Sequence, residues 1–467
     1  MNRSCPALRR LWPPLLCACL VLAGCAHPVD VSTPADRPAP LPAQWSETGP
    51  ARDAARLAAW WQLFDDPQLA ALVEDALKAN TDLRSAAATL AQARALRDVT
   101  AAGRQPQVGV GASTGRNRSG DVSGNSVRGG LDASWELDVF GATRQALRGA
   151  EADVRTAEAD LATTRLSIAG EVGQAYVQLR GYRQQQALAQ QSLAAQLETL
   201  QITQWRAQAG LASSLDAEQA RATAEQTRAS LPTYASNIAQ TEHRLAVLLA
   251  LPPNALQARL GDSTVLPVAD AATLPLGLPA DLLRARPDVR AAESAITAET
   301  ARLAQRQAQA LPSFSISGSL ALQAASAAAL GNGAAVVSSI AAAVSWPLWD
   351  GGANRAQQAA QQAVLERSRI AYEAAVLTAL QDVENALSAL RASQAQRTHL
   401  EAADEAARTA LLLARQQYQA GLVDFTTLLD AQRTALSIAV NLASARTSEG
   451  LNLVLLYKGL GGGWTPA

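Results

Sequence analysis

The stretch TDLRSAAATLAQARALRDVTAAGRQPQVGVGAS (81–113) returns in altered form as PDVRAAESAITAETARLAQRQAQALPSFSISGS (287–319). At a shift of 206 residues, Pro106 aligns with Pro312, and each proline follows an alanine- and arginine-rich segment. Such a segment is typical of a helix, and the proline marks its end. Internal repeats of this kind indicate that the fold is built from two related halves.

A second pair of similar segments extends the duplication. SWELDVFGATR (134–144) matches SWPLWDGGANR (345–355) at a shift of 211 residues, which also brings Gly210-Leu211 onto Gly421-Leu422. The change of shift falls in a stretch rich in Gly, Ser and Asn, where loops absorb insertions. Each half is therefore predicted to contain a helix, two strands, a very long helix, a glycine turn and a returning helix.

The predicted strands alternate apolar residues with small or polar ones. A period of two with one polar face indicates strands, and segments of about ten such residues fit outer-membrane barrels. Trp135 and Trp346 lie at matching ends, where an aromatic girdle is expected. The strands are expected near residues 106–115, 127–137, 312–322 and 336–347.

Four strands do not close a membrane barrel, whose smallest members have about eight. An open edge in lipid leaves backbone groups without hydrogen bonds, at several kcal/mol each. If these strands span a membrane, several protomers must share one barrel. The residues alone leave open whether two protomers give 8 strands or three give 12. A soluble β-sandwich edge is the other reading, but it does not explain two hairpins about 200 residues apart.

No proline interrupts the expected long helices at 141–209 and 352–420. At 1.5 Å per residue, each is roughly 100 Å long. Their alanine content favours close side-by-side packing, and a plain coiled-coil dimer is the alternative. We expect Gly210 and Gly421 to end these helices with positive φ. Ser213 and Asp424 are expected to cap the helices that follow.

Residues 1–24 have a basic start and a short apolar run, which predicts a secretory signal peptide. The sequence Leu22-Ala-Gly-Cys25 resembles a bacterial lipobox, in which Cys25 becomes lipidated after cleavage. The other three cysteines lie within the signal, so the mature chain is expected to form no disulfide. Ala26 is compatible with transfer to the outer membrane.

Composition argues against several classes of function. The formal charge is −1, and removing the three signal arginines gives −4, so we expect no nucleic-acid partner. His27, His243 and His399 are far apart, so neither a metal site nor another cofactor is expected. No nucleophile–base set is visible, which argues against an enzyme. The predicted domains are 25–60 (lipidated linker), 61–250 (first repeat), 251–285 (equatorial linker), 286–457 (second repeat) and 458–467 (tail).

Four segments resemble a known family. They are WWQLFDDPQLAALVEDALKANTDLRSA (60–86), LLRARPDVRAAE (282–293), YQAGLVDFTTLLDAQRTAL (418–436) and LYKGLGGGW (456–464). Together with the lipobox and the duplication, they are similar to TolC-like outer-membrane efflux proteins. The similarity is greatest to the OprM-like (NodT-type) lipoproteins, and it covers almost the whole mature chain.

The resemblance implies a mainly α-helical homotrimer in the outer membrane. Four strands from each protomer would form a 12-stranded β-barrel in outer-membrane lipid, and the long helices would form a periplasmic α-helical barrel. It further implies the exit duct of a tripartite efflux system for drugs or other small toxic compounds. The partners would be a periplasmic adaptor (membrane fusion) protein and an inner-membrane RND pump.

The resemblance also implies roles for individual residues. Tyr418 and Asp430 match the family's periplasmic gate, and Thr426 stands where many relatives carry a leucine constriction. Gln417 replaces an arginine common in relatives, which removes one restraining salt bridge. The turns at Gly210, Leu211, Gly421 and Leu422 match the ends that dock the adaptor.

Two other functions remain open at this point. The first is the outer-membrane outlet of a type I protein-secretion system. The second is a lipid-anchored coiled-coil scaffold without a pore.

Overall fold

In a computed structural model, the structure describes residues 54–261, 263–267, 286–331 and 335–462. These residues are mainly helical with a small strand part, as predicted. They divide into two units. The strand unit contains Leu90–Thr156 and Ala292–Tyr372, and the helical unit contains the other described residues.

The first half begins with η2 (Ala54–Phe64), α2 (Pro67–Ala79), α3 (Thr81–Ala102), β1 (Gln107–Ser119) and β2 (Val122–Leu137). It continues with α4 (Ala142–Gln208) and α5 (Ser214–Leu248), and the short η3 (Pro253–Ala255) and α6 (Gln257–Leu260) follow. The second half contains α8 (Pro287–Gln309), β3 (Ser313–Ala324), η5 (Ala327–Gly331), β4 (Val336–Ser345), α9 (Ala353–Gln419) and α10 (Phe425–Gly459). The long helices α4 and α9 both have 67 residues, and the returning helices α5 and α10 both have 35.

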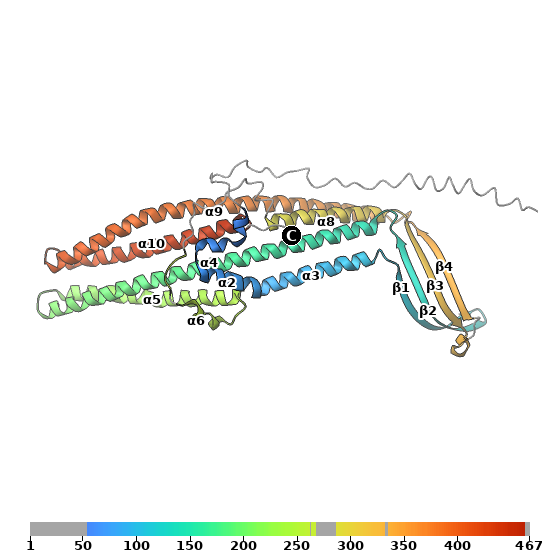
Figure 1. Cartoon of the computed structure of the whole chain (residues 1–467), viewed down its shortest axis with the longest axis horizontal. Coiled ribbons are helices and arrows are strands. Elements are labelled where there is room, and N and C mark those ends of the chain that lie inside the picture. Colours follow the sequence, from blue (N-terminus) through green and yellow to red (C-terminus); the bar gives the residue numbers. More distant parts are fainter. Residues whose placement is uncertain (1–53, 262, 268–285, 332–334, 463–467) are drawn as a thin grey trace, which may run out of the picture. The chain divides into compact units, whose positions relative to one another are not determined.

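The strand unit contains one antiparallel sheet with the order β1-β2-β3-β4 (Figure 1). Each hairpin pairs within its own half, and β2 pairs with β3, which joins the two halves. The first hairpin continues beyond the expected strand ends, to Ser119 and from Val122. Backbone pairing does not require apolar side chains, so the ladder continues where the apolar alternation stops.

The register collects the apolar residues of all four strands on one face. Val110 lies opposite Leu131, which lies opposite Leu320. Two residues along β3 from Leu320, and therefore on the same face, Gly318 lies opposite Ile340. Val110, Leu320 and Ile340 are 84%, 55% and 88% exposed in the protomer. The other face carries mostly serine, glycine and alanine with some charged residues. The sheet therefore has one apolar face and one more polar face.

The helical unit has an aromatic core near the chain's described ends. The ring of Trp60 stacks on Tyr457 with centroids 5.6 Å apart, and Phe64 packs edge-on against both. Gly181 allows a close approach of α10 to α4, because a Cβ there would lie 2.7 Å from Cγ2 of Thr447. Close packing of this kind fixes the position of α10 against α4.

A buried polar network joins α2 to α4. The hydroxyl of Tyr176 donates to Asp66 at 2.8 Å, and Arg180 donates to the same hydroxyl and to Gln68. Burial, aided by Asp66, raises the pKa of Tyr176 to about 12 although Arg180 opposes the shift. Tyr176 therefore remains a neutral donor at physiological pH.

Asn80 and Arg286, which are 206 positions apart, make equivalent hydrogen bonds in the two halves. Asn80 precedes α3, accepts two backbone N–H groups of that helix, and donates to the carbonyl of Leu248 at 2.9 Å. Arg286 precedes α8 and donates to the carbonyl of Gly459 at 2.8 Å. Each contact ties the start of a short helix to the end of a returning helix.

Candidate functional site

The turns between the paired long helices have the same geometry in both halves. Gly210 and Gly421 have φ angles of 73° and 72°. The N–H groups of Leu211 and Leu422 donate to the carbonyl five residues back, at 2.7 and 2.9 Å. This is the Schellman arrangement, in which a residue with positive φ ends the helix. The predicted positive φ angles are confirmed.

The returning helices begin at the predicted caps. The hydroxyl of Ser213 accepts from the N–H of Asp216 at 3.1 Å, and the carboxylate of Asp216 accepts from the N–H of Ser213. Asp424 accepts from the N–H and the hydroxyl of Thr427. These hydrogen bonds lower the pKa of Asp424 below its usual range. Both expected caps are confirmed, so each turn has a defined shape.

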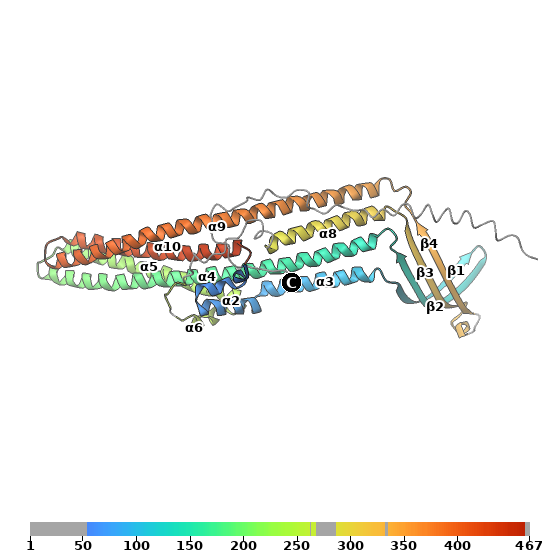
Figure 2. The same cartoon turned by 45° about the horizontal axis from the view of Figure 1, so that its top comes forward.

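Each turn presents one leucine to solvent. Leu211 is 76% exposed and Leu422 is 75% exposed. The paired helices α4 with α5 and α9 with α10 run side by side toward these turns (Figures 1 and 2). An exposed apolar side chain on a well-formed turn is suited to contact another protein.

Tyr418 lies in a small apolar cluster next to the second turn. Its ring packs edge-on against Phe425 with centroids 5.7 Å apart, and Leu200 and Leu429 belong to the same cluster. The guanidinium of Arg206 lies 5.1 Å from the centre of the Tyr418 ring. This cation–π contact joins the end of α4 to the end of α9.

Thr426 and Asp430 are exposed on the first turns of α10. They are four residues apart, so they share one face of this helix. In the described part of the protomer, no hydrogen bond joins Asp430 to Tyr418. The structure therefore brings Tyr418 together with Phe425 and leaves Asp430 on the exposed side of α10.

Contacts between α9, α10 and α4 supply restraints that sequence reasoning missed. Gln417, which stands where many relatives are expected to carry an arginine, is exposed. Two residues earlier, Arg415 places one guanidinium nitrogen 3.1 Å from both carboxylate oxygens of Glu198. Gln432 donates to the hydroxyl of Thr199 at 3.0 Å. The partners are more than 200 residues apart, so no local sequence signal could have indicated them.

The two expected girdle tryptophans make matching hydrogen bonds. The indole N–H of Trp135 donates to the carbonyl of Arg104 at 3.0 Å, and that of Trp346 donates to the carbonyl of Ala310 at 3.3 Å. Trp135 lies within β2, whereas Trp346 follows the last residue of β4. Both rings are more than one-third exposed, at 39% and 55%.

The expected lipidation site, Cys25, lies outside the described residues. Among the described residues, no helix is long and apolar enough to cross a bilayer. The same residues contain no group of three or more His, Cys, Asp or Glu side chains that could hold a metal ion.

Residues 72–251 and 278–462 match the family described as outer membrane efflux protein. The chain is 30% identical to nodulation protein T of Rhizobium leguminosarum bv. trifolii over 457 residues, which cover 96% of each chain. It is 31% identical to the pyoverdine export outer membrane protein OpmQ of Pseudomonas aeruginosa over 471 residues, again 96% of each. The structure of the outer-membrane channel OprN is similar with a TM-score of 0.86 and 36% identity, covering 93% of this chain and 100% of OprN.

These matches cover most of the chain and agree with one another. The chain belongs to the outer membrane efflux protein family. It is an efflux protein of the outer membrane, as the resemblance implied. The function it performs is transport.

Proposed function

We propose that three copies of this chain form the exit duct of a tripartite RND-type efflux system that exports drugs or other small toxic compounds. The four-stranded sheet would supply one third of a 12-stranded barrel, and the paired long helices would continue it as a periplasmic tunnel. The observation that carries this proposal is the sheet with one exposed apolar face and two edge strands, β1 and β4.

The edge strands argue for sharing a barrel between copies. β4 has 10 residues, and alternate residues of an edge strand point both backbone groups outward. About ten polar groups on that edge would lack partners in hydrocarbon, at several kcal/mol each. The cost of an isolated sheet is therefore tens of kcal/mol. Pairing β4 of one copy with β1 of the next removes that cost.

The gate of this duct would lie near the turn between α9 and α10. Three copies of Asp430 would form a ring of like charges that attracts cations and repels anions. Thr426, one turn away on the same face, makes this constriction more polar than a leucine would. Contacts of Tyr418 with Arg206, and of Arg415 with Glu198, would hold α9 against α4 in the resting state.

A conductance experiment tests the duct and its gate. We expect the purified assembly to carry ion current in a planar lipid bilayer with a preference for cations. Asp430→Asn should reduce that preference because it removes the ring of charge. Glu218→Gln, which removes another exposed carboxylate, from α5, serves as the control. Absence of current from both wild-type and Asp430→Asn assemblies would refute the duct and favour a scaffold without a pore.

The exposed turns are the proposed docking points for the periplasmic adaptor. A β-branched residue is strained at positive φ, so Gly421→Val should distort the turn and impair drug export. The comparison is made at equal protein levels in the membrane. Normal resistance at normal levels would count against docking at this turn.

Cys25 is the proposed attachment site of the lipid anchor. Radioactive palmitate should label the wild-type chain and leave Cys25→Ser unlabelled. Equal labelling of both chains would remove this part of the proposal without affecting the duct.

A further inference from the structure

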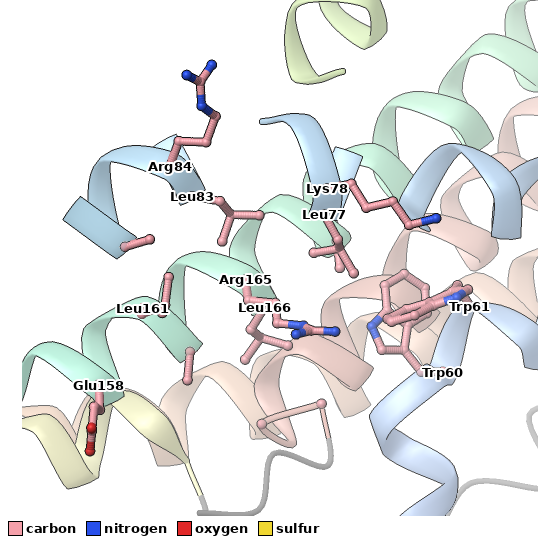
Figure 3. A pocket seen from close by; sticks show the side chains of 15 residues that line it. Trp60, Trp61, Leu77, Lys78, Leu83, Arg84, Glu158, Leu161, Arg165 and Leu166 are labelled. Carbon is pink, nitrogen blue, oxygen red and sulfur yellow. The ribbon is translucent and has the colours of Figure 1, made fainter. Parts of the chain in front are cut away.

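A groove of about 560 Å³ opens on the surface of the helical unit (Figure 3). We call it the Trp60 groove. Its apolar lining includes Trp60 and Trp61 of η2, Leu77 of α2 and Leu166 of α4, and α3 contributes Leu83. A volume of this size with a mostly apolar lining is typical of sites for small organic ligands. The groove is distant in sequence from the gate residues and plays no part in the proposed duct.

Two indole donors in this groove, those of Trp60 and Trp61, lack an acceptor among the described residues. Trp60 is 1% exposed, and its indole N–H has no hydrogen-bond partner among the described residues. Figure 3 shows the nitrogen on the side of the ring that faces Leu166 and Arg165. Buried polar groups are normally hydrogen-bonded, so an unpaired donor at the wall of a groove calls for an acceptor that the protomer does not supply.

The charges around the groove are mainly positive. Lys78, Arg84 and Arg165 line it, are exposed, and have no ion-pair partner among the described residues. In Figure 3, Arg84 points away from Trp60, whereas the head group of Arg165 lies on the Trp60 side. Glu158 also lines the groove, and the figure places it at the end far from the tryptophans. The tryptophan end therefore combines cations, an N–H donor and apolar walls.

We propose that the Trp60 groove binds an anionic amphiphile, a compound with a carboxylate or phosphate monoester head on a short apolar body. The head would accept from Lys78, Arg165 and the indole N–H of Trp60. The apolar body would lie against Leu77 and Leu166. A fatty acid and a lysolipid phosphate share this chemistry, whereas a cationic amphiphile would be repelled by Lys78 and Arg165.

Bromine quenches indole fluorescence on contact, so brominated amphiphiles report binding next to Trp60. The full-length assembly in phosphatidylcholine nanodiscs is titrated with 8-bromooctanoate, 8-bromooctyl phosphate and the neutral 8-bromooctan-1-ol. We expect saturable quenching by one or both anions, at least tenfold tighter than by the alcohol. A tighter carboxylate indicates a fatty acid as the natural ligand, and a tighter phosphate indicates a lipid phosphate.

Two double variants test the cations. Lys78→Gln combined with Arg165→Gln should weaken anion binding at least tenfold. Arg221→Gln combined with Arg228→Gln removes two exposed arginines from α5 and should leave binding unchanged.

Trp60→Phe keeps an aromatic ring but removes one of the two unpaired indole donors and one of the two indoles in the groove that report binding. It should reduce the amplitude of quenching. Non-saturable quenching, or equal affinity for anion and alcohol, overturns the proposal. So does a Lys78/Arg165 variant that binds like the wild type. The proposal is equally overturned if the assembly shows no quenching because a neighbouring copy fills the groove.

Discussion

The contact between β2 and β3 joins the two halves of the chain, and one glycine makes it possible. Gly130 lies opposite Ala321 in the register. A Cβ added to Gly130 would lie 2.5 Å from Cβ of Ala321, 2.6 Å from its Cα and 2.7 Å from the carbonyl oxygen of Leu320. Carbon atoms normally approach to 3.5–4.0 Å, roughly. Gly130→Ala must therefore push the two strands apart.

The expected cost follows from this geometry. Overpacking by one methyl group typically costs about 1–3 kcal/mol. Two of the three close atoms belong to the backbone and cannot rotate away, so the upper part of that range applies. If three copies share one barrel, a cost of about 2–3 kcal/mol is incurred three times, which gives about 6–9 kcal/mol for the assembly. Ala321→Gly in the same chain removes only the nearest atom, so it should restore the stability in part.

The neighbouring glycine provides the control. A Cβ at Gly129 would meet nothing within 4 Å, so Gly129→Ala should lie within about 0.5 kcal/mol of the wild type. The measurement is the midpoint temperature at which the purified assembly loses strand signal by circular dichroism and dissociates on a gel. The expected order is Gly130→Ala lowest, the rescued double variant intermediate, and Gly129→Ala equal to the wild type. Equal midpoints for the Gly129 and Gly130 variants would refute the reasoning.

Two further predictions concern the helices. Gly181→Ala should destabilise the protein by about 1–3 kcal/mol because its Cβ would collide with Thr447. Gly149→Ala on the same helix meets nothing closer than 3.6 Å and should stabilise by up to about 1 kcal/mol through helix propensity; denaturant unfolding followed by circular dichroism separates the two, and the same sign for both would contradict the argument. Burial acts to raise the pKa of Asp288, but the hydrogen bond and charge of Arg286 outweigh it, so the pKa lies below its usual range. The stabilisation from ionised Asp288 is then complete above the ordinary carboxyl pKa and is lost as pH falls through the lowered value. Asp288→Asn should therefore be less stable than the wild type at pH 7 and equally stable in strong acid. A difference in stability that does not depend on pH would exclude this linkage.

Much of the fold could be predicted from local pattern. The positive φ angles of Gly210 and Gly421 and the caps at Ser213 and Asp424 depend on residues within one turn of the helix, and all four are confirmed. The strand faces followed from a period of two. These features need only the preferences of short segments, which the sequence displays directly.

Other features required contacts between distant residues. The pairing of β2 with β3 was not predicted. Each hairpin is a complete local unit, and the sequence of neither hairpin indicates which other strand it pairs with. The local sequence around Arg286 also gives no sign that its side chain is buried. Its side chain lies among residues far along the chain, such as Gly459, 173 residues later, whose carbonyl accepts from it at 2.8 Å.

The candidate site also has a part that could be predicted from the sequence and a part that could not. Tyr418, Thr426 and Asp430 could be named from the family pattern, but their surroundings could not. The contact of Arg206 with Tyr418 exists only after α4 and α9, one from each half of the chain, have packed together. The groove beside Trp60 likewise forms only where η2 and α2 pack against α4. The sequence by itself determined the order, ends and faces of the elements, because these depend on hydrogen bonds and side-chain periodicity over a few residues. Tertiary structure alone decided which elements meet, because that depends on close packing between surfaces whose residues are hundreds of positions apart.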